Sequence, residues 1–135
     1  QKTAYEIYQC DWSSVVCSSD LATGALGERR VFVETEPGCS PDGSAVDEEG
    51  CLWNAQWGGW QVVRYRPNGT VDEVVKMPVE QPSSCAFGDQ DLSTLYVTSA
   101  REGLSAEALD RQPLAGSLFC FKPGVKGAPL PEFAG

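Results

Sequence analysis

Two segments about 40 residues apart repeat one pattern, and this repeat is the feature that most constrains how the chain can fold. When the stretches that begin at Pro41 and Pro82 are aligned, Asp42 falls on Ser83. The segments that follow them, QVVRYRPNG and SLFCFKPG, match in the same way. Self-similarity at this period is typical of β-propeller blades. The alternative is a general meander sandwich in which the similarity is accidental.

Apolar residues alternate with polar ones in short runs separated by Gly, Pro and Asn, which predicts an all-β chain. We expect strands at residues 5–8, 30–33, 44–47, 52–56, 61–65, 71–77, 85–87, 94–99 and 117–121, and a last one near Phe133. This arrangement holds the last two strands of one unit, a complete four-stranded unit and a third unit interrupted by REGLSAEALDRQPLAG. Helical spacing occurs only at Leu104 to Gln112, where we expect a short helical turn.

Composition excludes several classes of partner. A chain of 135 residues that is 41% hydrophobic suits one globular domain. The net charge of −9, with Lys and Arg scattered singly, leaves no basic stripe for nucleic acid. No apolar run approaches the roughly 20 residues of a membrane span, and no signal peptide is visible, so we expect no membrane partner and a cytoplasmic location. The first residues carry no initiator Met and suggest a piece of a longer chain.

The chain contains no histidine, and this absence limits its site chemistry. Ser-His-Asp and Cys-His catalytic groups and His-ligated zinc are excluded, which leaves carboxylates, amides and carbonyls and favours a hard cation. The cysteines form no CxxC pair, and a chain of this size needs no disulfide framework, so we expect reduced and mostly buried thiols. They are Cys10, Cys17, Cys39, Cys51, Cys85 and Cys120.

Asp42 is the candidate site residue. In a propeller blade the first strand lies nearest the central axis, so Asp42 and Ser83 are expected at equivalent axial positions near the tunnel mouth. A carboxylate beside a glycine that permits close backbone approach suits a hard-metal ligand or a general base. The structural alternative is that Pro-Asp-Gly forms only a turn entering a strand, since all three residue types favour turns.

From Ala22 to Gly135, the chain resembles the C-terminal half of the regucalcin (senescence marker protein), gluconolactonase and sugar-lactonase family. The motifs that carry the resemblance, in family order, are ATGALGERRVF, PDGSAVDEEGCLWNAQWGG, VVRYRPNG, SSCAFG, LYVTSAREGLSAEALDRQPLAGSLF and GVKGAPLPEFAG. The resemblance implies about half of a six-bladed propeller with four-stranded antiparallel blades. It also implies hydrolysis of sugar-acid lactones with a divalent cation, calcium, zinc, manganese or magnesium, at one mouth of the tunnel.

The resemblance assigns a role to Asp42 alone. It implies that Asp42 is a metal ligand and the candidate for activating the attacking water, while the other ligands and the substrate-binding groups fall on blades that this chain lacks. We therefore expect the chain to be inactive by itself and to self-associate through open blade edges. The alternative function is a non-catalytic calcium-binding or regulatory propeller.

Residues 10–21, CDWSSVVCSSDL, lack both apolar alternation and turn chemistry. They resemble the translated read of a common sequencing adapter, Asp-Trp-Ser-Ser-Asp-Val-Cys-Ser-Ser-Asp-Leu, and Val15 is the single mismatch. We interpret residues 1–9 as a strand remnant, 10–21 as an artefactual insert and 22–135 as C-terminal blades of one incomplete domain. The alternative is an extended functional loop with a Cys pair, and independent nucleotide reads would distinguish the two.

Two smaller signals have structural explanations. Asn68-Gly69-Thr70 is formally a glycosylation sequon, but Asn-Gly between two strand signals predicts a tight hairpin turn. Trp53, Trp57 and Trp60 are expected to pack inside a blade rather than to form a sugar-stacking platform.

Overall fold

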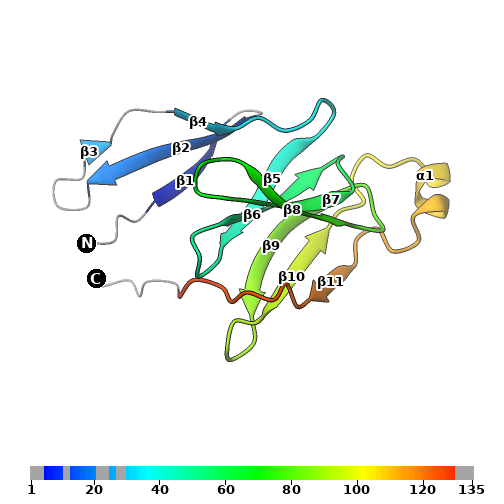
Figure 1. Cartoon of the computed structure of the whole chain (residues 1–135). Coiled ribbons are helices and arrows are strands. Elements are labelled where there is room, and N and C mark those ends of the chain that lie inside the picture. Colours follow the sequence, from blue (N-terminus) through cyan, green and yellow to red (C-terminus); the bar gives the residue numbers. More distant parts are fainter. Residues whose placement is uncertain (1–4, 11–12, 21–24, 27–29, 130–135) are drawn as a thin grey trace.

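A computed structural model describes residues 5–10, 13–20, 25–26 and 30–129, with side chains described from residue 31 onward. The described residues form three antiparallel sheets that follow one another along the chain (Figure 1). The strands are β1 (Tyr5–Cys10), β2 (Ser13–Asp20), β3 (Ala25–Leu26), β4 (Arg30–Val33), β5 (Ser40–Val46), β6 (Leu52–Trp57), β7 (Gln61–Tyr65), β8 (Val71–Lys76), β9 (Pro82–Gly88), β10 (Thr94–Ser99) and β11 (Leu118–Phe121). The all-β prediction is therefore confirmed, and the strand expected near Phe133 lies outside the described residues.

The central sheet is a complete four-stranded meander in the order β5-β6-β7-β8. Its β7-β8 hairpin turns at Asn68-Gly69, where Gly69 has φ +84° and its N–H donates to the Arg66 carbonyl at 2.8 Å. The Arg66 N–H closes the hairpin on the Thr70 carbonyl at 2.8 Å. The predicted tight turn is confirmed, because glycine adopts this left-handed conformation without steric cost.

The last sheet has the order β9-β10-β11, and its two later strands are separated by a helical excursion. Within the excursion lies helix α1 (Ala106–Arg111), inside the predicted segment. Ser105 is its N-cap, and the Ser105 hydroxyl accepts a hydrogen bond from the Ala108 N–H at 3.1 Å. The predicted interrupted third unit is confirmed in its order of elements.

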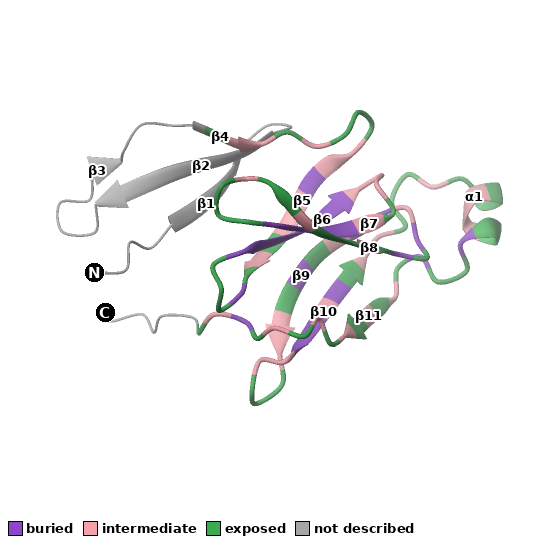
Figure 2. Cartoon of the chain, viewed as in Figure 1, coloured by how far each residue is buried: buried purple, intermediate pink, exposed green. Residues whose placement is uncertain are grey.

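The core lies between the central and last sheets. Trp53 on β6 is fully buried, and its ring meets Phe87 of β9 edge to face, with centroids 6.4 Å apart, and Phe121 of β11 at 6.1 Å. Leu95 and Val97 of β10 are also fully buried. Figure 2 shows the buried positions concentrated on β6, β7 and β10. Both faces of β6 are buried, and its two polar residues, Asn54 and Gln56, are buried together with the apolar ones.

The first sheet differs from the prediction. Residues 13–20, within the segment interpreted as an insert, form β2, which pairs antiparallel with β1 from Tyr5↔Ser18 to Cys10↔Ser13 and with β4 on its other side. We predicted no strand there, because SSVVCSSD has paired rather than alternating apolar residues. The backbone pairing shows that this segment takes part in the sheet. The proposed nucleotide origin of the segment stays a prediction.

Among the described residues, no helix is long and apolar enough to cross a membrane.

Candidate functional site

Asp42 lies inside strand β5, at a bulge. The pairing of β5 with β6 shifts register between Pro41 and Ser44, so that Asp42 and Gly43 together stand opposite one residue of β6. The interpretation of Pro-Asp-Gly as a turn that enters a strand is wrong, because β5 begins at Ser40. Bulges bend a strand and redirect its side chains, and they are enriched beside functional sites.

Asn54 of β6 closes the bulge from one side. Its Nδ2 donates to the Asp42 carbonyl oxygen at 2.9 Å and to Ser44 Oγ at 2.9 Å. The Ser44 hydroxyl also donates to the Asp42 carbonyl, at 3.3 Å. Asn54 is 1% exposed, and its Oδ1 has no hydrogen-bond partner in the described part of the chain. Sequence reasoning missed this residue, since only the register of β5 against β6 brings it to Asp42.

Strand β9 closes the bulge from the other side. A Cβ at Gly43 would stand 2.6 Å from the Cα of Ser84, closer than van der Waals contact allows. The Cys85 thiol donates to the Trp53 carbonyl at 3.2 Å and, more weakly, to the Gly43 carbonyl at 3.6 Å. Burial raises the pKa of Cys85 to about 12, so the thiol keeps the proton that it donates at neutral pH.

Asp42 and Ser83 were both predicted to lie near the central axis, and the strands that carry them, β5 and β9, are in contact. Strands β5 and β9 pack against each other, as aligned first strands of neighbouring blades should. Ser83, the residue aligned with Asp42, shares a hydrogen bond of 2.9 Å between its Oγ and Thr98 Oγ1. The predicted direction of the Asp42 side chain toward a common axis stays a prediction.

The described residues do not complete a metal site. In the part of the chain whose side chains are described, no group of three or more His, Cys, Asp or Glu could hold a metal ion. Asp42 offers one carboxylate, whereas calcium and zinc sites require several protein ligands fixed together. A cation held by Asp42 could therefore not take its remaining ligands from a cluster of acidic and cysteine side chains among the described residues.

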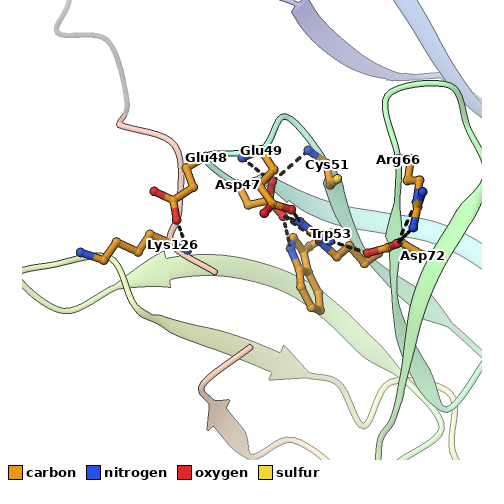
Figure 3. A network of polar contacts seen from close by, with 9 residues as sticks. Asp47, Glu48, Glu49, Cys51, Trp53, Arg66, Asp72 and Lys126 are labelled. Carbon is orange, nitrogen blue, oxygen red and sulfur yellow. Dashed lines mark hydrogen bonds and ion pairs between the residues drawn. The ribbon is translucent and has the colours of Figure 1, made fainter. Parts of the chain in front are cut away.

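A second polar cluster surrounds Asp47, which directly follows β5 (Figure 3). The Asp47 carboxylate accepts hydrogen bonds from the backbone N–H groups of Glu49 at 3.0 Å and Cys51 at 2.9 Å. It also accepts from Trp53 Nε1 at 3.0 Å and from Arg64 Nε at 2.8 Å. The carboxylate is fully buried and satisfied, so this cluster holds the β5-β6 turn to β7 rather than offering a reactive group.

Arg64 extends the cluster toward solvent. Its guanidinium contacts Glu49 at 2.6 Å and also pairs with Asp72 of β8. Burial by itself lowers the pKa of Arg64, but the hydrogen bonds to Glu49, Asp47 and Asp72 outweigh that effect and raise the pKa. Arg64 therefore stays charged, and the sequence alone offered no signal that would pair it with Asp47 across two strands.

The tryptophans differ in burial. Trp53 is fully buried, as predicted, and its ring packs against the last sheet. The prediction of burial is wrong for Trp60, which is 39% exposed, and Trp57 is half-buried. Trp60 lies in the turn between β6 and β7 and has φ +57°.

Comparison with known proteins identifies the family to which the chain belongs. Residues 6–101 match the model of the SMP-30/Gluconolactonase/LRE-like region. Regucalcin of Gallus gallus is 43% identical over 137 aligned residues, which cover 99% of this chain and 46% of the relative. L-arabinolactonase of Azospirillum brasilense is 43% identical, with 96% of this chain and 40% of the relative covered.

A solved structure shows the same fold. The calcium-binding protein regucalcin from Agrobacterium tumefaciens strain C58 matches with a TM-score of 0.76 and 35% identity, covering 86% of this chain and 39% of that one. The chain thus spans less than half the length of each of these relatives.

Proposed function

Because the chain belongs to the SMP-30/gluconolactonase/LRE-like family, we propose that its complete protein hydrolyses sugar-acid lactones, with Asp42 as a catalytic residue. The observation that carries the proposal is the similarity to a named sugar lactonase across nearly the whole chain. The position of Asp42 in a bulge that is held from both sides supports it. We further propose that these sheets are consecutive blades of a six-bladed propeller.

Lactone hydrolysis needs a base at the attacking water. A lactone is a cyclic ester, so water adds to the carbonyl carbon, the bond from that carbon to the ring oxygen breaks, and a hydroxy acid results. We assign to the Asp42 carboxylate the removal of a proton from the water, while the ring oxygen leaves as a hydroxyl after taking up a proton. In the complete protein, Asp42 would hold a divalent cation together with ligands from segments outside this chain, and that cation would polarise the lactone carbonyl.

The test is an assay of the complete protein with a gluconolactone and an L-arabinonolactone. Asp42→Asn is expected to lower kcat at least about 100-fold, since a positioned base contributes about that much. Asp110→Asn, on the exposed face of α1, is the matched control and should keep the wild-type rate. Absence of lactone turnover by the wild-type protein, or full activity of Asp42→Asn, would overturn the proposal.

The 135-residue chain alone is expected to be inactive, because no group of three or more His, Cys, Asp or Glu among its described residues could hold a metal ion. The purified chain can be assayed with calcium, zinc, manganese or magnesium added in turn. Appreciable metal-dependent lactone hydrolysis by the chain would show that this expectation is wrong.

A second candidate function is a calcium-binding module without catalysis, and the description of the Agrobacterium relative as a calcium-binding protein favours it. Calorimetric titration of the complete protein with calcium distinguishes the two candidates. Calcium binding with no turnover of either lactone would favour the binding module.

A further inference from the structure

We propose that Asn54 is a positioning residue for Asp42: its side-chain amide fixes the β5 bulge and thereby the direction in which the Asp42 carboxylate points. The inference rests on the proposed function for its catalytic consequence, but its structural content is independent of that function. Asn54 contacts the backbone of Asp42 and is not itself assigned to the reacting atoms.

The bulge creates the need for such a residue. Where two residues of β5 stand opposite one of β6, the regular ladder is interrupted. Asn54 Nδ2 supplies a donor to the Asp42 carbonyl at 2.9 Å. The same Nδ2 donates to Ser44 Oγ on the far side of the bulge, so one amide spans the irregular step.

The amide is itself rigid. Asn54 is 1% exposed and stands on β6 between Trp53 and Ala55, both of which are fully buried. Its Oδ1 is buried without a partner among the described residues, which costs free energy that an apolar residue of similar size would not cost. The two hydrogen bonds that Asn54 Nδ2 makes explain why an amide stands in the core although its oxygen has no partner among the described residues.

Strand β9 completes the clamp. The Cys85 thiol donates to the Gly43 carbonyl, and the Cα of Ser84 leaves no room for the bulge to move toward β9. The carbonyl of Asp42 is thus held from β6 and the carbonyl of the next residue from β9. With both peptide groups after the Asp42 Cα restrained, the direction of its Cα–Cβ bond is restrained as well.

Gln56 provides a matched control on the same strand. It is also 1% exposed and lies two residues along β6, so its side chain projects from the same face. Its amide nitrogen donates to Tyr65 Oη at 2.7 Å, and its amide oxygen accepts from Gln61 Nε2 at 2.7 Å, so these two bonds run to β7. Gln56 stands opposite Pro41, next to the bulge. Gln56→Leu therefore removes a buried amide whose bonds run to β7, whereas Asn54→Leu removes the amide whose bonds span the bulge.

The first measurement uses amide hydrogen exchange in the 135-residue chain. Asn54→Leu is expected to accelerate exchange at residues 42–44 by at least about 10-fold relative to β7, because the bulge opens locally. Gln56→Leu should change exchange at residues 42–44 no more than at β7. Asn54→Asp keeps the size of the side chain but places a carboxylate next to the Asp42 carbonyl oxygen. It replaces Asn54→Leu in this measurement if the leucine variant does not fold, and the same acceleration is expected.

The second measurement uses the complete protein and lactone turnover. Asn54→Leu is expected to lower kcat about 10- to 100-fold with KM within about twofold, because small misplacements of a catalytic group have effects of that size. Gln56→Leu should stay within about threefold of wild type. Equal losses in the two variants, or wild-type kcat and exchange in both Asn54 variants, would overturn the inference. If the proposed function is wrong, the wild-type protein will not hydrolyse either lactone. The exchange measurement then tests by itself whether Asn54 holds the bulge.

Discussion

The Arg64 guanidinium and the Asp47 carboxylate form a buried ion pair, with Nη2 at 2.7 Å from Oδ2. The pair joins the third strand of the central sheet to the end of its first strand. Because Asp47 also receives the indole N–H of Trp53, this pair ties the polar edge of the sheet to the residue at the centre of the core. The pair therefore shares Asp47 with the tryptophan that packs the central sheet against the last one.

Asp47→Ala is expected to lower the free energy of unfolding by about 3 kcal/mol, because it leaves a buried guanidinium with fewer partners. Urea denaturation followed by tryptophan fluorescence measures the loss. The control is Glu107→Ala, which breaks the exposed Glu107–Arg111 pair of α1 and should cost less than about 1 kcal/mol. Equal losses in the two variants would contradict the prediction.

Asp72 should make stability depend on pH in the acidic range. Hydrogen bonds from Arg66 and then Arg64 hold the pKa of Asp72 below its ordinary value. A carboxylate whose pKa is lower in the folded state stabilises the fold fully above its unfolded pKa, near 4, and loses that contribution as pH falls through the folded value. Asp72→Asn should therefore flatten the decline of stability below about pH 4, measured by urea midpoints across pH. An acid limb as steep as that of the wild type would show that the pairing contributes nothing.

The described cysteines should differ in reactivity. Cys85 and Cys51 are buried with raised pKa values, through burial in both cases and in Cys51 also through the Asp47 charge, whereas Cys120 is exposed. Brief alkylation of the native chain at neutral pH, followed by peptide mass spectrometry, should label Cys120 and spare Cys51 and Cys85 until urea is added. Labelling of Cys85 as fast as Cys120 in the native chain would indicate that the contact between β6 and β9 is open.

Strands whose burial alternates or is continuous could be predicted from sequence. The ranges 61–65 and 94–99 coincide with β7 and β10, because their β-branched runs end at turn residues. Strand β2 could not be predicted, since its pairing with β1 and β4 comes from its place between two good strands rather than from its own pattern. The four described cysteines are free thiols as expected, but only two of them are buried.

The site was only partly visible in the sequence. Asp42 stands in a motif that resembles a family pattern, so one residue could be named. Asn54 lies twelve residues further along the chain and reaches Asp42 only through a register shift, which no periodicity encodes. Arg64 and Asp47 are separated by a whole strand for the same reason. Contacts that depend on how strands are aligned, rather than on their residue pattern, were the part that could not be foreseen.

Because the space between Gly43 of β5 and Ser84 of β9 is narrow, the residues tolerated at these two positions should depend on each other. Because any side chain at position 43 would meet the backbone of Ser84, a library that varies both positions should recover almost no residue other than glycine at 43. Changes at 84 that bend β9 outward would be the only suppressors, and each would also shift Asp42. The absence of one methyl group therefore sets the spacing between two sheets at the place where catalysis is proposed.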